Sequence, residues 1–258
     1  MSGQVDKSVE AKNTLLCQNL DTIVFQDMNN DIEILKIFYT LIDSSFSHFL
    51  DTKDSSESVL CADKITNAIV KVTLRHKTFL KDTVEYFSKT YRLDSHSLHV
   101  AIYAVNLAYR LGLDDDDLSS IAMAAMFMDT GLCNKKIDIT KETTVFGDAK
   151  PDIVLNHPKK SVEIAKKNHI YNPYILEAIL HHHERYDGSG YPEHLHGRNI
   201  STYATILGIC DTFDALTVDR PHRKSYTSFQ ALQFMLKDAS MSGKFNQQYL
   251  RKFLQLFV

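Results

Sequence analysis

The stretch His181–Pro192 reads HHHERYDGSGYP and places three consecutive histidines directly before a glycine-rich segment. Neutral imidazole is the commonest protein ligand for metal ions near physiological pH. The two glycines and Pro192 predict a turn, because these residues end regular structure and let the chain change direction. The pattern therefore predicts a helix that ends where a metal ion and a loop meet. The alternative is a chance run of histidines at a helix end, and residues elsewhere in the chain weigh against it.

The overall composition is that of a globular protein rather than a membrane or nucleic-acid-binding one. Hydrophobic residues make up 44% of the 258 residues and charged residues 24%. No apolar run approaches the ~18 residues that a membrane span needs. The N-terminal segment MSGQVDKSVEAKN lacks the apolar core of a signal peptide, so we expect a cytoplasmic protein without membrane association. The net charge of −3 gives no electrostatic reason to bind DNA.

Cysteine, glycine and proline usage narrows the fold class. The four cysteines are widely spaced and form no CxxC pair, which argues against a disulfide scaffold and against a cysteine-based zinc site. The chain has only nine glycines and five prolines, and its apolar residues recur mostly at helical spacing. We therefore predict an all-α fold.

Three regions are expected along the chain. Residues 1–20 are polar and weakly patterned, as in a disordered arm. Residues 21–90 carry two apolar helical stripes separated by a polar break at 51–58, and form a predicted helical N-terminal region. This region could dock on the rest of the chain, form a homodimer or respond to a partner, and the sequence leaves these alternatives open. The third region, residues 91–258, contains the histidine run.

The third region predicts a series of helices. One begins near Asp94 and ends at Gly112, and a very apolar one ends at Asp129. Another begins around Asn156–Pro158, with the proline in the first turn. Further helices are expected over Tyr171–His183 and Ile200–Leu216, and two amphipathic helices between Ser228 and Phe257. Asp211 and Asp214 lie three apart and share one helix face.

Six residues at the ends or turns of five of these helices are candidate metal ligands. They are His96, Asp129, His157, His182, His183 and Asp211. Mixed imidazole and carboxylate donors without thiolate suit iron, manganese or zinc and fit a two-metal hydrolytic site. Two adjacent metal ions can hold a phosphate oxygen for in-line hydrolysis of a phosphodiester. The basic turn with Arg220, Arg223 and Lys224 could hold a phosphate by charge-assisted hydrogen bonds.

These segments together resemble the HD-GYP family over about residues 91–258. The matching segments, in family order, are HSLHV (His96–Val100), FMDTG (Phe127–Gly131), NHP (Asn156–Pro158), HHERYDGSGYP (His182–Pro192) and CDTFDALTVDRPHRK (Cys210–Lys224). The resemblance implies an HD-domain-like helical bundle of bacterial signal transduction. Its expected reaction is metal-dependent hydrolysis of cyclic di-GMP or a related cyclic dinucleotide, with iron or manganese favoured over zinc. Some members bind diguanylate cyclase domains through the GYP loop, which makes such a domain a possible partner.

The resemblance also assigns roles to individual residues. It makes His96, Asp129, His157, His182, His183 and Asp211 the metal ligands, with Asp129 bridging two ions, and leaves His181 as an extra histidine. Gly190 and Tyr191 match the loop beside the substrate. Arg220 matches the arginine that contacts a substrate phosphate, with Arg223 as its companion and Lys224 beside them. Asp129, Tyr191 and Arg220 are therefore the expected catalytic residues.

The chain departs from the family pattern at two positions that take part in the reaction: a metal ligand and a cation near the scissile phosphate. Met128 stands in place of the histidine of the HD pair, and a thioether is a poor ligand for iron or manganese. Leu132 stands in place of a lysine near the scissile phosphate, which removes a cation where charge develops. Arg92 occupies the position of a glutamate that binds a third metal in some members, so we expect no third metal.

The losses fall on one of the two metal sites. Asp129, His157, His182 and His183 form a complete set for one ion, whereas the other set keeps only His96, Asp129 and Asp211. We therefore predict one well-bound metal and a second that is weak or absent. His99, one helical turn from His96, is a candidate substitute for the missing ligand.

Three functions remain open from the sequence. The first is a cyclic di-GMP phosphodiesterase with reduced activity, favoured by the GYP loop, the complete ligand set and the basic turn. The alternative is a catalytically inactive domain that binds a cyclic dinucleotide or acts as a protein scaffold, favoured by Met128 and Leu132. An unrelated helical metal-binding protein would require the GYP match to be accidental.

Overall fold

The computed structural model describes residues 17–20, 30–50, 55–76, 79–87, 93–133, 152–219 and 224–258, without the side chains of 43–50, 55–58, 86–87 and 93–94. The regular elements within these ranges are helices, and an isolated β-bridge pairs Asp187 with His196 in the loop after α9. The predicted all-α class is therefore confirmed. The helices are α3 (Asp31–Leu50), α4 (Ser55–Arg75), α5 (Phe79–Phe87), α6 (Leu93–Leu111), α7 (Asp115–Phe127), α8 (Asp152–Lys167), α9 (Pro173–His181), α10 (Thr202–Thr217), α11 (Ser228–Lys237) and α12 (Gln247–Leu254), with 3₁₀ turns η1 (Thr130–Leu132) and η3 (Gly197–Asn199).

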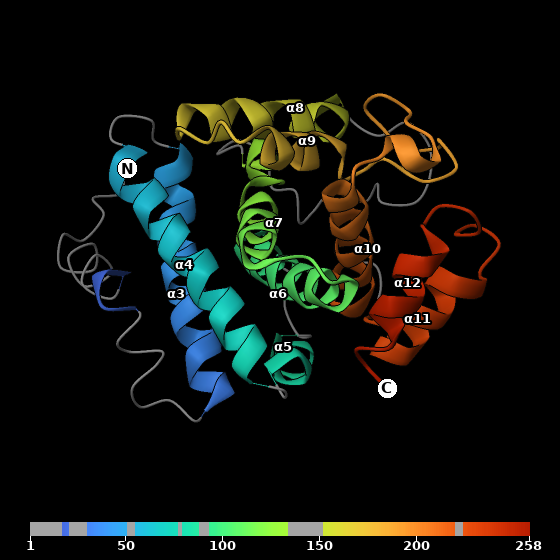
Figure 1. Cartoon of the computed structure of the whole chain (residues 1–258), viewed down its shortest axis with the longest axis horizontal. Helices are drawn as coiled ribbons and strands as arrows, with labels where there is room; N and C mark the ends of the chain where they lie inside the picture. Colours follow the sequence, from blue (N-terminus) through green and yellow to red (C-terminus); the bar gives the residue numbers. More distant parts are fainter. Residues whose placement is uncertain are drawn as a thin grey trace.

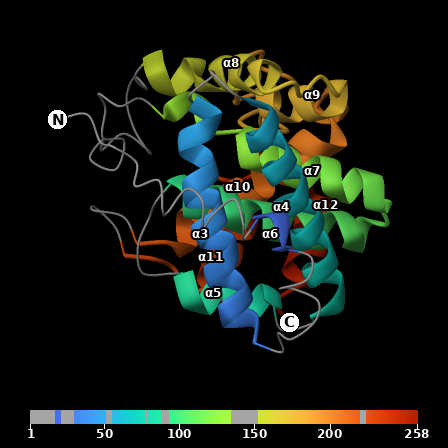
Figure 2. The same cartoon turned by 90° about the vertical axis from the view of Figure 1, so that its left-hand side faces the viewer.

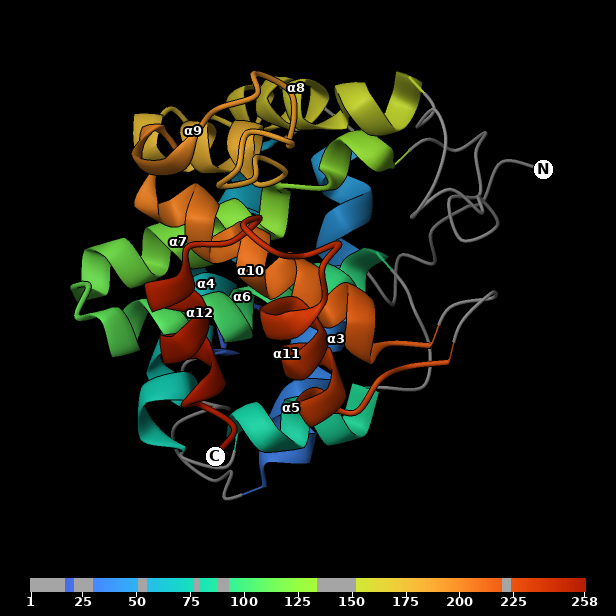
Figure 3. The ribbon, with the colours of Figure 1, turned by 90° about the vertical axis from the view of Figure 1, so that its right-hand side faces the viewer.

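Helices α6 and α7 form the centre of the molecule because they are apolar on nearly all sides. Every residue of α7 from Ile121 to Phe127 is buried, and α6 is equally closed around Tyr103. A helix that is apolar all round must be covered on all sides. Helices α3 and α4 cover one side, α10 lies on the other, and α8 and α9 lie across the end of α7 (Figure 1). Helices α11 and α12 pack beyond α10 (Figure 3).

The N-terminal helices are part of the same hydrophobic core. Buried residues of α3, α4 and α5 belong to one cluster with those of α6 and α7. Figure 2 shows α3 and α4 in front of the central helices. Of the alternatives left open for residues 21–90, docking on the rest of the chain is therefore observed within the described residues. The division into three regions stays a prediction.

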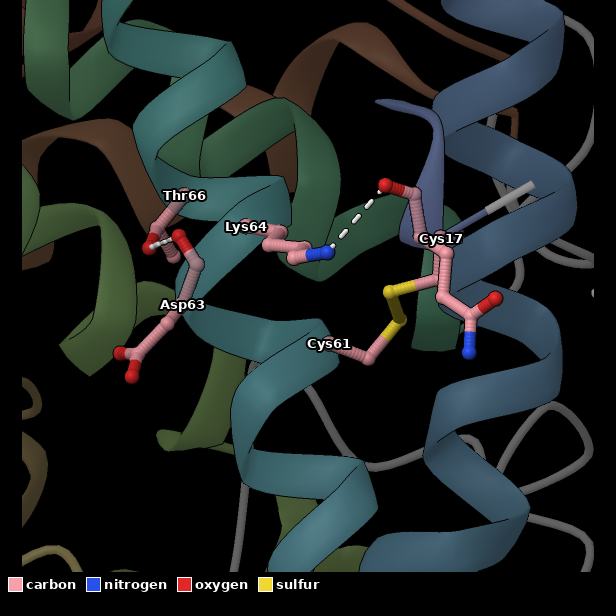
Figure 4. Close-up of a disulfide and its surroundings, with 6 residues drawn as sticks. Cys17, Cys61, Asp63, Lys64 and Thr66 are labelled. Atoms are coloured by element: carbon pink, nitrogen blue, oxygen red, sulfur yellow. Dashed lines mark hydrogen bonds between the residues drawn. A yellow bond between two sulfur atoms is a disulfide. The ribbon is translucent and has the colours of Figure 1, made fainter. Parts of the chain in front are cut away.

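The N-terminus differs from the expected disordered arm at its end and forms a disulfide that the sequence did not predict. Cys17 and Leu20 lie inside the predicted disordered arm, yet both are buried. Cys17 is joined to Cys61 of α4 by a disulfide, with the two Cα atoms 5.9 Å apart (Figure 4). Lys64 Nζ also donates to the carbonyl oxygen of Gln18 at 3.3 Å. Cysteine spacing could not reveal this bond, because a sequence separation of 44 says nothing about the distance between the two cysteines in space.

The helix bounds near the site differ from the expectation at one informative place. Helix α8 begins at Asp152, so Pro158 is the seventh residue of the helix and not a first-turn residue. Proline inside a helix leaves the carbonyl four residues earlier without its usual donor. Here that carbonyl belongs to Val154, and the imidazole Nδ1 of His157 donates to it at 2.6 Å. The side chain of His157 thus replaces the backbone hydrogen bond that Pro158 cannot make.

Two other helix ends have identifiable causes. Gly112 ends α6 as predicted. Its φ is +85°, a backbone conformation that residues other than glycine adopt only with strain. Asn172 caps α9, its Oδ1 accepting from the backbone of Tyr174 at 2.9 Å, so this helix starts two residues later than predicted. In the described part of the chain, no helix combines the length and the apolarity needed to cross a membrane.

Candidate metal centre

The six predicted ligands converge from five helices on one buried site. His96 lies in the first turn of α6, Asp129 follows the end of α7, His157 lies in α8 and Asp211 in α10. His182 and His183 come directly after the last residue of α9. Their exposed fractions run from 0% for His182 to 9% for Asp211, apart from the half-buried His183. The end of α7 is directed towards α8 and α9 (Figure 1).

Asp129 is at the centre of this arrangement. One carboxylate oxygen, Oδ1, lies 3.1 Å from His157 Nε2 and 3.6 Å from His182 Nε2. The other oxygen, Oδ2, lies 3.3 Å from His96 Nε2. Burial acts to raise the pKa of Asp129, but its close interactions with the rings of His157, His182 and His96 hold that pKa well below its ordinary value. Asp129 is therefore an ionised carboxylate whose two oxygens face two different sets of imidazoles.

Backbone carbonyls fix the rings of His157 and His182. His157 Nδ1 donates to Val154 and His182 Nδ1 donates to Ile179 at 2.7 Å. With each Nδ1 occupied, each Nε2 faces the site, and the two Nε2 atoms are 3.3 Å apart. Ligating histidines are oriented in this way by the partner of their other nitrogen.

His183 completes the group from a different direction. Its Nδ1 lies 3.5 Å from Asp211 Oδ2, and the ring of Tyr191 stacks on its imidazole with centroids 4.8 Å apart. Burial lowers the pKa of His183 well below its usual range, and the nearby His182, His157 and Arg185 lower it further. His183 is thus neutral near pH 7, which is the form that binds a metal ion.

The donor set fits a divalent metal ion. Asp129, His157, His182 and His183 each offer a ligand atom, and these atoms lie within 4.8 Å of one another. His96 Nε2 lies 3.3 Å from Asp211 Oδ1 on the other side of Asp129. The nearby Cys210 is no competitor, because burial and the charges of Asp211 and Asp214 raise the pKa of its thiol. The nitrogen and oxygen donors are those that iron, manganese and zinc accept.

Asp214 is a buried carboxylate beside the site whose partners the sequence did not reveal. It is fully buried, and its two oxygens bind His96 Nδ1 at 2.7 Å and His99 Nδ1 at 2.8 Å. Burial acts to raise its pKa, but the electrostatic interaction with His99 and the hydrogen bonds from both histidines lower it. The only signal in the sequence was that Asp214 shares a helix face with Asp211. The predicted substitute ligand His99 thus has its Nδ1 committed to Asp214.

Glu184 holds the loop that follows the histidines, a second role missed from the sequence. Its Oε1 accepts from the backbone of Glu193 at 2.7 Å and its Oε2 from Leu195 at 3.0 Å. Gly190 lies so close to the backbone of residues 183–185 that a Cβ would overlap it. The loop is therefore folded back onto the end of α9, and only glycine fits at position 190.

Arg185 is a buried cation beside the cluster and was also missed. Its Nη1 donates to the carbonyl oxygens of His182 at 3.1 Å and Glu184 at 2.9 Å. Its Nη2 lies 4.0 Å from Asp211 Oδ2, and the guanidinium sits 5.6 Å from the centre of the Phe245 ring. Arg185 thus satisfies the carbonyls at the end of α9 and balances the charge of Asp211.

The remaining predicted residues divide into placed and unplaced ones. Tyr191 is buried, and burial with the charges of Asp211 and Asp129 raises its pKa, so its hydroxyl stays protonated. His181 is outside the four-residue group, with its Nε2 3.3 Å from Glu193 Oε2. Arg92, Arg220 and Arg223 lie outside the described residues, and the roles of these arginines and of Lys224 stay predictions.

The low pKa of His183 predicts a pH dependence of stability in chelator-treated protein. Unfolded histidine takes up a proton near pH 6.5, whereas folded His183 does not. Stability is therefore lost as the pH falls below 6.5. Between pH 7.5 and 5.5 the native chain should lose about 1 kcal/mol more unfolding free energy than His183→Gln, measured by urea titration. His194→Asn, at an exposed loop position, should lose as much as the native chain; equal losses in all three proteins would contradict the prediction.

The fold and the site together define a helical domain with a buried histidine–aspartate metal centre. The family model described as HD domain matches residues 76–245, and the chain belongs to this family, in its HD-GYP branch. A cyclic di-GMP phosphodiesterase of Pseudomonas aeruginosa is 28% identical over 83% of this chain and 49% of its own length. A 3'3'-cGAMP-specific phosphodiesterase of Vibrio cholerae is 31% identical over 54% of this chain and 30% of its own length.

A solved structure supports the fold. An HDGYP-type protein from Bdellovibrio bacteriovorus superimposes with a TM-score of 0.80 over 98% of this chain and 81% of its own, at 14% identity. At that identity the match shows the fold alone. The chain spans about half or less of the length of the two curated relatives described above.

Proposed function

We propose that this chain binds a cyclic dinucleotide of the cyclic di-GMP class at the histidine–aspartate site and hydrolyses its phosphodiester bond, more slowly than a complete ligand set would allow. The observation that carries the proposal is Asp129, whose two oxygens face His157 and His182 on one side and His96 on the other. A carboxylate so placed suits two adjacent cations of a hydrolytic centre. The relatives named for cyclic di-GMP and cGAMP hydrolysis support the substrate class.

The two sides of Asp129 are proposed to differ in metal affinity. Asp129, His157, His182 and His183 would hold one divalent ion tightly, with iron or manganese favoured over zinc. His96, Asp129 and Asp211 would hold a second ion weakly, because Met128 offers a thioether where an imidazole is needed. The chemistry that such ions supply is Lewis-acid polarisation of a phosphoryl oxygen.

The protein side chains would bind and orient the substrate. Tyr191 keeps its hydroxyl proton and stacks on His183, so it can donate a hydrogen bond beside the cluster without adding negative charge. Gly190 lets the loop lie against the end of α9. Arg220, Arg223 and Lys224 are proposed to contact the phosphates by charge-assisted hydrogen bonds. Asp219 Oδ1 accepts from the backbone of Ser225 at 2.7 Å, which brings the two ends of this basic turn together.

A second candidate is a catalytically inactive binder in the same pathway. It is favoured by Met128, which is fully buried immediately before Asp129, and by Leu132 in place of a lysine. Such a domain would keep the loop and the complete ligand set, and act by binding the dinucleotide or a diguanylate cyclase domain through the GYP loop. A homodimer through the N-terminal helices would have little apolar surface to use, because most described apolar residues of α3 and α4 are buried within the chain.

The test is hydrolysis of cyclic di-GMP and of 3'3'-cGAMP by anaerobically purified, chelator-treated protein after addition of Fe(II) or Mn(II). The expected result is a slow, metal-dependent appearance of linear dinucleotide by chromatography. Calorimetric binding of the dinucleotide to metal-loaded protein without turnover would favour the inactive binder. Metal-loaded protein that neither binds nor hydrolyses either dinucleotide would overturn both candidates.

A further inference from the structure

Asp214 joins two buried histidines that come from the same turn of α6. Its Oδ2 binds His96 Nδ1 at 2.7 Å and its Oδ1 binds His99 Nδ1 at 2.8 Å. All three side chains are at most 2% exposed. A carboxylate can only accept, so each imidazole donates from Nδ1. This pairing fixes which nitrogen of each ring carries the proton.

The consequence for His96 is a defined direction of its other nitrogen. Its Nε2 lies 3.3 Å from Asp129 Oδ2 and 3.3 Å from Asp211 Oδ1. His157 and His182 reach the equivalent orientation through backbone carbonyls. His96 lies in the first turn of its helix, and its Nδ1 is instead held by Asp214, which comes from α10. The orientation of His96 therefore depends on a side chain that can be mutated.

The second oxygen of Asp214, Oδ1, is held by His99, which suggests what this second histidine does. A carboxylate held by one hydrogen bond can still rotate about its side-chain bond, whereas one held at both oxygens cannot. His99 lies one turn beyond His96 and binds the oxygen that His96 leaves. Its ring also lies beside Tyr103, with centroids 6.3 Å apart, in the core of α6. His99 thus fixes the carboxylate that fixes His96.

We propose that Asp214 and His99 are positioning residues for the metal site of His96, with Asp214 orienting His96 and His99 orienting Asp214. The inference rests on the proposed function, because it assigns His96 to a metal ion. It gives His99 a supporting role in place of the predicted role as a replacement for the ligand lost at Met128. It also predicts that a change at Asp214 affects only the His96 side of the centre, since His157 and His182 are oriented by backbone carbonyls.

The test uses the full chain with ¹⁵N-labelled histidine, and Zn(II) as the probe. In metal-free native protein, His96 and His99 should carry their proton on Nδ1, and Asp214→Asn should give His96 a mixture of the two protonated forms. On titration with Zn(II), the concentration that half-shifts the His96 signals should rise ~10–100-fold in Asp214→Asn. The signals of His157 and His182 in the same sample are the internal control and should respond at nearly the native concentration.

Two variants of His99 distinguish positioning from ligation. His99→Asn keeps an N–H donor for Asp214 but has no second nitrogen for a metal, so the response of His96 to Zn(II) should stay near native. His99→Leu removes the donor and should behave like Asp214→Asn. Asp117→Asn replaces a carboxylate of α7 that binds the hydroxyl of Tyr203, away from the cluster, and should leave His96 unchanged.

Each result bears on the inference separately from the proposed function. Loss of the His96 response in His99→Asn would make His99 a ligand and overturn the positioning role. The positioning role would also be overturned if, in Asp214→Asn, His96 kept its proton on Nδ1 and responded to Zn(II) at the native concentration. If no histidine responds to Zn(II), the proposed function fails, while the proton position on His96 in metal-free Asp214→Asn still decides whether Asp214 orients it.

Discussion

Asp129→Asn is expected to abolish tight metal binding and any hydrolysis, and to have the largest effect of any single substitution in the site. The substitution keeps the size of the side chain but removes the charge that faces His96, His157 and His182. Because we propose that both sides of the centre share this carboxylate, we expect both to lose a charged ligand. We expect metal affinity to fall by more than ~100-fold, beyond the 10–100-fold that is typical when only a supporting partner is lost.

The measurement is metal content after equilibrium dialysis against Mn(II), together with the rate of dinucleotide hydrolysis. Asp116→Asn is the matched control, because it removes an exposed carboxylate from the first turn of the same helix, α7. This control should retain native metal content and activity. Metal affinity of Asp129→Asn within tenfold of native would show that the ion is held elsewhere.

Met128→His should have the opposite effect and create a stronger second metal site. The new imidazole would stand directly before Asp129 and replace a soft, uncharged thioether with a ligand suited to iron or manganese. We expect bound metal to rise towards two equivalents per chain and hydrolysis to rise by ~10²-fold, the scale of one charge-stabilising group. Adding Leu132→Lys should raise the rate further. Metal-free Met128→His should be ~1–3 kcal/mol less stable than native protein, because the polar imidazole is then buried without a metal ion or hydrogen-bond partner.

Met128→Leu is the control for this gain. It keeps the volume of the buried side chain and should cost less than ~1.5 kcal/mol. Metal content should equal that of native protein, since we do not expect the thioether to be a ligand. A native chain that already holds two ions at full occupancy, or a Met128→Leu variant that loses one, would contradict the account of Met128.

The residue types and their order along the sequence predicted which motif side chains would come together; the roles assigned to them stay predictions. The helical periodicity identified the main helices, and the six proposed ligands do meet, through contacts such as that of His157 with Asp129. The residues that support them were missed. Asp214 and Glu184 bind partners that are distant in sequence or belong to the backbone, such as His96 and the amide of Leu195. Such pairings depend on how helices pack, which periodicity does not determine.

The error in the predicted start of α8 and the unforeseen disulfide have the same origin. Pro158 is a helix-starting signal in isolation, and it is tolerated inside α8 only because a side chain serves the carbonyl of Val154. Cys17 and Cys61 meet because the segment 17–20 packs on α4. In both cases a contact formed by the folded chain overrides the local preference.

The wide separation of the site residues along the chain links metal uptake to protein synthesis. His96 and its partner Asp214 are 118 residues apart, and the other residues of the centre come from the helices between them. A nascent chain therefore has no complete centre until α10 has left the ribosome and packed against α6. Metal ions that bind only the finished site stabilise it by mass action. Metal bound on the His96 side of the centre would thus report that α10 has packed against α6, and chains truncated before α10 should bind no metal ion on that side.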